Sequence, residues 1–168
     1  ETWVDDWLLE LNPTKCQTLR VTRSRSPIQH PYDIHGHVLE EVHHATYLGV
    51  KISKDLSWNK HIDKMVGKAN STLGLLRRNL KTPCRDLKER AYNTLVRPKV
   101  EYCSTVWDPH TKKNIKGIEM VQRRAARYVC NRFHNTSSVT TMLEELGWKK
   151  SGTPQSIHKN VHDVQDSP

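Results

Sequence analysis

The apolar residues change their spacing at about residue 57, and this change constrains the fold more than any other feature of the sequence. Before it, apolar and polar side chains alternate over a few residues at a time. After it, apolar residues recur every three or four positions over long stretches. Alternation is typical of a half-buried strand, and the longer spacing is typical of one face of a helix. The sequence therefore predicts an α+β chain, in which a small antiparallel strand lobe is followed by a mainly α-helical bundle.

The strand-bearing part is predicted to open with a short helix over residues 3–11. Its apolar residues share one helical stripe: Trp3, Trp7 and Leu11. Asn12-Pro13 should end this helix, because proline cannot continue the hydrogen-bond ladder. Residues 16–22 and 47–52 alternate and predict strands. Residues 32–42 predict a hairpin that turns at His35-Gly36, where glycine supplies a positive φ.

Four helical segments are predicted in the second part. Ser57 suits the N-cap of the first, and Thr82-Pro83 suits the start of the second. Pro98 should kink or break the second helix, and a kink is favoured because the apolar pattern resumes after it. The third covers residues 112–130, and the fourth covers residues 138–146 and ends at Gly147.

Each of these helices has an expected apolar face. On the first helix it includes Ile62, Met65, Ala69, Leu73 and Leu76, on the second Leu87, Ala91, Leu95 and Val96, and on the third Ile115, Ile118, Val121, Ala125, Tyr128 and Val129. From residue 149 onward the apolar pattern gives way to Ser, Gly, Pro, Gln, Asn and His. We therefore predict three parts: a strand-bearing part in residues 1–55, a helical part in residues 56–148 and a disordered tail in residues 149–168.

The charge of the chain favours a polyanionic partner. In 168 residues there are 27 Lys and Arg against 18 Asp and Glu, a formal net charge of +9. Nucleic acid and an anionic membrane surface are the two candidates, and nucleic acid is the stronger. No apolar run is long enough to cross a bilayer, so no part of the chain is expected to span one. With nucleic acid as the stronger candidate, no membrane partner is expected. The four cysteines are widely spaced, which favours free thiols and a location in the nucleus or cytoplasm.

The third helix concentrates this charge in a basic ridge. Lys112, Lys116, Arg123 and Arg127 lie near one face, with Arg124, Lys113 and Arg132 beside them. Such a ridge can contact successive phosphates through charge and bidentate guanidinium bonds. A solvated face is the alternative, and for any single lysine it is the better interpretation. Lys60, Lys64, Lys68, Arg77 and Arg78 decorate the first helix in a similar way.

Other chemistry is weakly supported. Asp5-Asp6 is a candidate metal pair, but adjacent carboxylates in an amphipathic helix point in different directions. Cys103, His110, Cys130 and His134 are too loosely spaced to predict structural zinc. The sequence has no glycine-rich phosphate loop and no serine in a nucleophile-elbow context. We therefore predict no metal site and no cofactor in this chain.

Several motifs occur in the order found in one enzyme family. Leu11-Asn12-Pro13-Thr14-Lys15-Cys16 resembles polymerase motif D of reverse transcriptases from non-LTR retrotransposons, the jockey-like group. Tyr47-Leu48-Gly49-Val50 resembles motif E, the primer grip. Residues 92–107 and Ile118-Glu119-x₂-Gln122-Arg123-Arg124-Ala125-Ala126-Arg127 resemble the thumb and the region just beyond it. The resemblance covers roughly residues 1–148.

The resemblance implies roles for particular residues. Lys15 would lie beside the incoming nucleotide's phosphates as an auxiliary catalytic residue, and Tyr47, Leu48 and Gly49 would support the 3′ end of the primer. Lys112, Lys116, Arg123, Arg124 and Arg127 would contact an RNA–DNA template–primer. The family's catalytic aspartates would precede Glu1, so the chain is expected to be inactive alone and to use Mg²⁺ only within the full-length polymerase. The palm and fingers of the same polyprotein are a second implied partner.

Two hypotheses from different classes remain at this point. The first is a catalytically incomplete part of a reverse transcriptase, comprising the end of the palm and the thumb. The second is a basic helical module, domesticated from such an element, that binds nucleic acid or a protein partner. Binding to a template–primer duplex that weakens as salt rises would favour nucleic-acid recognition over protein interaction.

Overall fold

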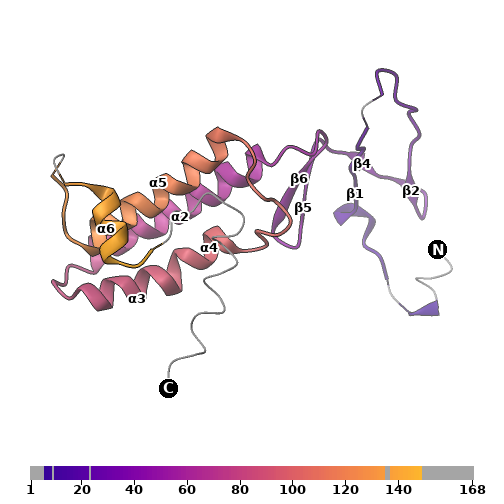
Figure 1. The fold of residues 1–168 in the computed structure, drawn as a ribbon. Coiled ribbons are helices and arrows are strands. Elements are labelled where there is room, and N and C mark those ends of the chain that lie inside the picture. The colour runs from indigo at the N-terminus through magenta and orange to yellow at the C-terminus, as the bar shows by residue number, and fades with distance from the viewer. Residues whose placement is uncertain (1–5, 9, 23, 135–136, 149–168) are drawn as a thin grey trace. The chain divides into compact units, whose positions relative to one another are not determined.

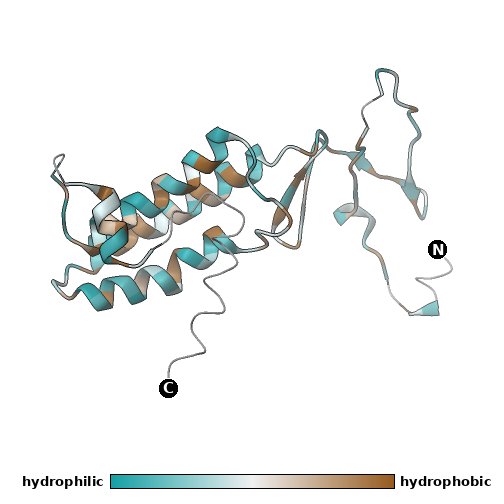
Figure 2. Cartoon of the chain, in the orientation of Figure 1, coloured by the Kyte–Doolittle hydropathy of each residue, from teal (hydrophilic) through white to brown (hydrophobic). Residues whose placement is uncertain are grey.

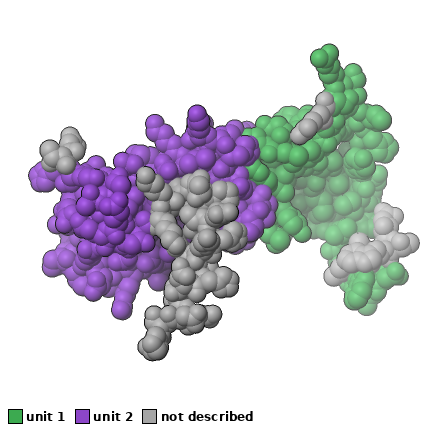
Figure 3. Space-filling view, viewed as in Figure 1, with its two compact units in different colours: residues 1–58 green, residues 59–168 purple. Residues whose placement is uncertain are grey.

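The computed structural model describes residues 6–8, 10–22, 24–134 and 137–148 (Figure 1). Short strands and helices are both present, so the predicted α+β class is confirmed. Contacts divide the chain into two compact units, residues 1–58 and residues 59–168 (Figure 3). The assignment of the chain to palm and thumb stays a prediction. The predicted tail, residues 149–168, lies outside the described residues.

Unit 1, residues 1–58, is built from short paired strands. In its described part the pairs are β1 (Gln17–Thr18) with β4 (Glu40–Glu41), β2 (Asp33–Ile34) with β3 (His37–Val38), and β5 (His44–Tyr47) with β6 (Val50–Ser53). The last two pairs are antiparallel, as predicted, whereas β1 and β4 run parallel. The predicted strand over residues 16–22 is therefore limited to two residues.

The hairpin predicted at His35-Gly36 is confirmed. Asp33 faces Val38 and Ile34 faces His37, so the two residues between the strands form the turn. Both have positive φ, +49° at His35 and +74° at Gly36, as a type I′ turn requires. The Asp33 carboxylate accepts a hydrogen bond from the Gly36 N–H at 3.3 Å, which fixes the turn locally.

Two predictions near the start of the chain differ from the structure. Most of the predicted helix over residues 3–11 cannot be compared, since Trp3 and its neighbours lie outside the described residues, but Trp7 and Leu11 are exposed rather than buried. Asn12-Pro13 was predicted only to end a helix, but it also begins one: Pro13 is the first residue of the 3₁₀ helix η1 (Pro13–Lys15). The Asn12 carboxamide oxygen accepts from the Thr14 N–H at 3.1 Å and so caps this helix.

Unit 2, residues 59–168, is organised around two long helices that run parallel. They are α2 (Asn59–Asn79) and α5 (Lys112–Val129), and they lie side by side in Figure 1. Asn114 donates to Asn59 at 2.9 Å near both N-termini, and Tyr128 donates to the Leu80 carbonyl at 3.2 Å near both C-termini. In the connection from α2 to α5, α3 (Arg85–Leu95) and α4 (Arg97–Glu101) carry the chain back toward the N-terminal end of α2. The last helix, α6 (Val139–Glu145), packs on α5.

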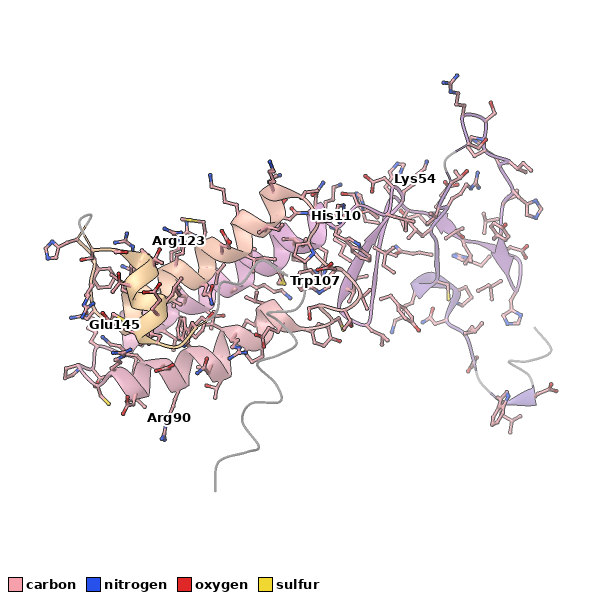
Figure 4. All side chains as sticks on the ribbon, in the orientation of Figure 1. Lys54, Arg90, Trp107, His110, Arg123 and Glu145 are labelled. Atoms are coloured by element: carbon pink, nitrogen blue, oxygen red, sulfur yellow. The ribbon has the colours of Figure 1, made fainter. Side chains whose placement is uncertain are left out.

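The predicted apolar faces of α2 and α5 form the core of unit 2. Figure 2 shows apolar and polar bands alternating along these helices, as expected where one face is buried. On α2 the buried residues include Ile62, Met65, Ala69, Leu73 and Leu76, and on α5 they include Ile118, Val121, Ala125, Tyr128 and Val129. Ile115 is only partly buried. Trp107, which is fully buried, lies in the segment between α4 and α5 (Figure 4).

The predicted apolar face of α3 is wrong in part. Leu87 and Leu95 are about half exposed, whereas Lys88, Tyr92 and Val96 form the buried stripe. This face of α3 is buried because Tyr92 and Lys88 contact aromatic rings from segments distant in sequence. The Trp148 ring stacks on Tyr92 at 4.5 Å between centroids, and the Lys88 ammonium lies 5.2 Å from the centroid of the Tyr128 ring. Helical periodicity cannot reveal which face meets such partners.

The helix boundaries follow the predicted caps and prolines with three exceptions. Pro98 lies in the first turn of α4, and the chain breaks at Val96 rather than bending there. α3 begins at Arg85, after the predicted start at Thr82-Pro83, and α2 begins one residue later than a cap at Ser57 would give. α5 and α6 agree with prediction: Thr111 and Ser138 cap their N-termini, and Gly147 follows α6 with φ +64°.

Candidate nucleic-acid interface

The basic ridge of α5 lies on the solvent side of the helix. At 100° per residue, Lys112, Lys116, Arg123 and Arg127 fall within about 60° of one another. Lys112, Lys116 and Arg123 are exposed and Arg127 is half-buried, opposite the buried residues Ile118, Val121 and Ala125. Figure 4 labels Arg123 on this helix. The structure therefore brings these four cations together on one face. Arg124, about 60° beyond Arg127, adds a fifth cation at its edge, and these five residues are called the basic ridge.

Two arginines of the ridge are held in place by neutral partners. Arg124 Nη1 donates a hydrogen bond to Oδ1 of Asn70, on α2, at 2.9 Å. Arg127 Nη1 donates to the His134 carbonyl at 3.2 Å. A guanidinium has five N–H donors, so each arginine keeps several for a ligand. Because their partners are uncharged, these contacts restrict the side chains without neutralising them. Sequence reasoning missed Asn70, since it lies on another helix.

The charge of the ridge is not compensated by acids. In the part of the chain that the structure describes, none of Lys112, Lys116, Arg123, Arg124 and Arg127 pairs with a carboxylate. Arg132, which was predicted to flank the ridge, differs. Its Nη1 lies 2.8 Å from a Glu145 carboxylate oxygen, and this hydrogen bond raises the pKa of Arg132. Arg132 therefore ties α6 to the end of α5 and is not a free cation.

The residues predicted as the primer grip form the tip of a hairpin. The predicted single strand over residues 47–52 is wrong, because Tyr47 and Val50 pair across a two-residue turn between β5 and β6. Leu48 and Gly49 form this turn with φ +46° and +83°. Sequence reasoning missed the turn because leucine rarely adopts a positive φ. Tyr47 and Leu48 are about 70% exposed, while Val50 is buried. The tip therefore presents a phenol and a branched apolar side chain to solvent.

Lys15 lies at the end of η1 in a locally ordered loop. It is exposed, and the loop is closed by Cys16, whose Sγ donates to the Asn12 carbonyl at 3.3 Å. Lys15, Tyr47, Leu48 and Gly49 belong to unit 1, whereas the basic ridge belongs to unit 2. The predicted site residues thus belong to two different compact units.

The described ranges contain no group of side chains suited to bind a metal ion. No three His, Cys, Asp or Glu side chains there are grouped so that they could hold a metal ion. Cys103, His110, Cys130 and His134 are accordingly not gathered into one donor group, and all four cysteines are free thiols. Burial raises the pKa of the Cys130 thiol. Asp5 lies outside the described residues, so the Asp5-Asp6 pair cannot be placed.

Among the residues that the structure describes, no helix combines the length and the apolarity that a bilayer span requires.

Comparison with known proteins gives one informative likeness. A 134-residue alignment pairs this chain, at 28% identity, with a Drosophila melanogaster protein described as "Probable RNA-directed DNA polymerase from transposon BS". The alignment covers 76% of this chain but only 14% of that polymerase. No family model and no solved structure matches the chain. The partial likeness supports a relationship between this chain and the reverse transcriptases of transposons.

Proposed function

We propose that this chain is a template–primer binding part of a non-LTR retrotransposon reverse transcriptase of the jockey-like group. In this proposal residues 1–55 are the end of the palm and residues 56–148 are the thumb. The observation that carries it is the ridge of five cations on α5 that no described acid neutralises. The likeness to a transposon polymerase supports RNA–DNA hybrid as the polyanion.

The ridge suits the backbone of a duplex. Lys112 and Arg127 are fifteen residues apart on one helix, and at 1.5 Å per residue they span about 22 Å. Double-stranded DNA rises about 3.4 Å per base pair along its axis, so this span equals the axial length of about six base pairs. Contacts of this kind go to phosphates and give affinity without sequence specificity. We therefore expect α5 to track a strand rather than read bases.

The hairpin tip would add a contact of another kind. Tyr47 and Leu48 offer an aromatic ring and an apolar side chain that can pack on the sugar and base of a primer end, while Gly49 lets the backbone approach closely. Lys15 would act as an auxiliary cation near the incoming nucleotide's phosphates in the full-length polymerase. Both roles belong to unit 1, so they can be tested separately from the ridge.

The proposal assigns binding to this chain and no catalytic step. Mg²⁺, which the family uses at paired aspartates, finds no fitting carboxylate group in the described part of the chain. The metal, the palm and the fingers would belong to the full-length polyprotein. A protein with this partner would work in the nucleus or the cytoplasm, where template RNA is present.

Salt-dependent binding tests the proposal. We expect the full chain to bind a fluorescein-labelled RNA–DNA hybrid, with an affinity that falls as salt rises. Replacing Lys116 and Arg123 by alanine should reduce the slope of log affinity against log salt by about 2, because each lost phosphate contact removes about one counterion.

A matched double variant controls for net charge. Arg90 and Lys99 are also exposed, and Arg90 projects from α3 away from α2 and α5 (Figure 4). Replacing both by alanine removes one arginine and one lysine, as in the ridge variant, but should leave the slope almost unchanged. Equal losses in the two variants would show that the charge is merely solubilising. Absence of hybrid binding at low salt would favour the alternative, a domesticated protein-interaction module.

A further inference from the structure

A cavity of about 450 Å³ lies within unit 2, and its lining includes none of the residues of the ridge. It is lined by residues from the end of α2, the following loop, α3 and the end of α5. Three of its lining side chains are cations, Arg77, Lys81 and Lys88, and two are aromatic, Tyr128 and Phe133. None of the lining residues is acidic. The cavity therefore combines positive charge with flat apolar surface.

Lys88 is the most unusual residue of this cavity. It is only 4% exposed, although lysine is rarely buried without a charged partner. Its Nζ lies 5.2 Å from the centroid of the Tyr128 ring, and within the described residues no carboxylate pairs with it. A ring face attracts an ammonium group, but it does not replace a counter-charge. Lys88 therefore offers this cavity a positive charge that no described carboxylate neutralises.

The other two cations surround the same space. The Arg77 guanidinium lies 5.1 Å from the centroid of the Phe133 ring, which positions its N–H groups without using them. Lys81 is exposed and follows α2 in sequence. The carbonyl groups at the end of α2 would repel an anion, but the Tyr128 hydroxyl donates to the Leu80 carbonyl at 3.2 Å. One of those acceptors is therefore already occupied.

We propose that this cavity binds a nucleoside monophosphate. Its phosphate would lie among Lys88, Lys81 and Arg77, and its base would use the aromatic surface of Phe133, which is 47% exposed. The volume is within the range of about 300–1,000 Å³ that small-molecule sites occupy, and inorganic phosphate alone would leave most of it unfilled. The nucleotide can be free or can be the 5′-phosphorylated end of a strand. The inference goes beyond the proposed function, because none of its residues belongs to the ridge.

Calorimetric titration of the full chain with AMP and with adenosine tests the inference. We expect AMP to bind at least about tenfold more tightly than adenosine, because hydrogen bonds to charged groups contribute most of the difference. Replacing Lys88 by methionine keeps the apolar stem and removes the charge, so it should weaken AMP binding by a similar factor. Arg90→Ala should leave AMP binding unchanged.

The remaining outcomes are decisive as well. Equal binding of AMP and adenosine, or no binding of AMP, would overturn the inference. If Lys88→Met does not fold, the paired change of Arg77 and Lys81 to alanine replaces it, and AMP binding unaffected by either change would also overturn the inference. The ridge variant with Lys116 and Arg123 changed to alanine should still bind AMP, which separates this site from the proposed function. Competition between AMP and a 5′-phosphorylated oligonucleotide, but not its 5′-hydroxyl counterpart, would identify a strand end; without such competition the ligand is the free nucleotide.

Discussion

At the scale of single residues, Trp107 shows how a side chain in irregular structure can anchor a helical unit. It is fully buried, its ring lies 5.6 Å from that of His61, and its indole N–H donates to the Tyr102 carbonyl at 2.7 Å. The hydrogen bond was not predictable, because it depends on a chain reversal after α4.

Replacing Trp107 by alanine should destabilise unit 2 by about 3–5 kcal/mol, because removal of a fully buried indole leaves a cavity. Urea unfolding monitored by far-ultraviolet circular dichroism measures the change. Trp7→Ala is the matched control, since Trp7 is 67% exposed and its loss should change the free energy of unfolding by less than about 0.5 kcal/mol. Similar losses in the two variants would contradict the assignment of Trp107 to the core.

His61 makes stability depend on pH. Burial lowers its pKa from the ordinary value of 6.5, and the nearby Lys64 lowers it further. The unfolded chain therefore binds a proton at a higher pH than the folded chain does. The contribution of neutral His61 to the free energy of unfolding is therefore fully present above pH 6.5. It is lost as the pH drops from 6.5 toward the pKa of His61 in the folded chain.

Unfolding in urea at pH 7.5 and at pH 5.0 tests this dependence. We expect the wild-type chain to lose more stability between these pH values than the His61→Gln variant, which cannot take up the proton. His110→Gln controls for the loss of an exposed histidine. The prediction fails if wild type and His61→Gln lose the same amount.

At the scale of elements, the sequence predicted helices well where both ends carried caps. Thr111 and Ser138 begin α5 and α6, and Gly147 follows α6, so local chemistry alone set those bounds. The buried face of α3 was not predictable, because Tyr92 and Lys88 meet rings that come from distant segments. The β5–β6 hairpin was missed because its turn begins with a leucine.

The same leucine gives a prediction for this hairpin. Leu48 has φ +46°, a conformation that asparagine adopts more readily, and Asn-Gly is the preferred pair in a type I′ turn. Leu48→Asn should therefore stabilise β5–β6 by about 0.5–1 kcal/mol. Slower amide hydrogen exchange in residues 44–53 would show this. If the exposed Leu48 side chain contacts a primer, Leu48→Asn should bind the hybrid more weakly although its hairpin is more stable. Gly49→Ala should lower both the affinity for the hybrid and the stability of the hairpin.

At the scale of the whole molecule, the sequence predicted which residues carry the charge but not how the helices present it. The ridge residues could be read from α5 alone, since they depend only on helical spacing. The parallel packing of α2 and α5 could not, because it depends on the return of the chain through α3 and α4. That packing places Asn70 beside Arg124, and the packing of α3 on α5 places Lys88 beside Tyr128, so tertiary contacts restrain Arg124 and form the wall of the cavity.

The two units should also differ in stability. Within the described part of unit 1, Val50 and Ser53 are the only buried residues, whereas unit 2 contains the large apolar core around α2 and α5. Regions with few buried contacts open most easily, since little free energy opposes their local unfolding. Amides of β1 to β4 should therefore exchange with solvent faster than those in the middle of α2 and α5.

Hydrogen exchange followed by mass spectrometry measures this difference along the whole chain. Trp107→Ala should then raise exchange in α2 and α5 and leave β2–β3 almost unchanged, because the indole packs within unit 2. Equal protection of β2–β3 and α2 in the wild-type chain would contradict the prediction. Addition of the RNA–DNA hybrid is the decisive comparison: if binding slows exchange in the hairpin at residues 44–53 as well as in α5, both units contribute to recognition of the same duplex.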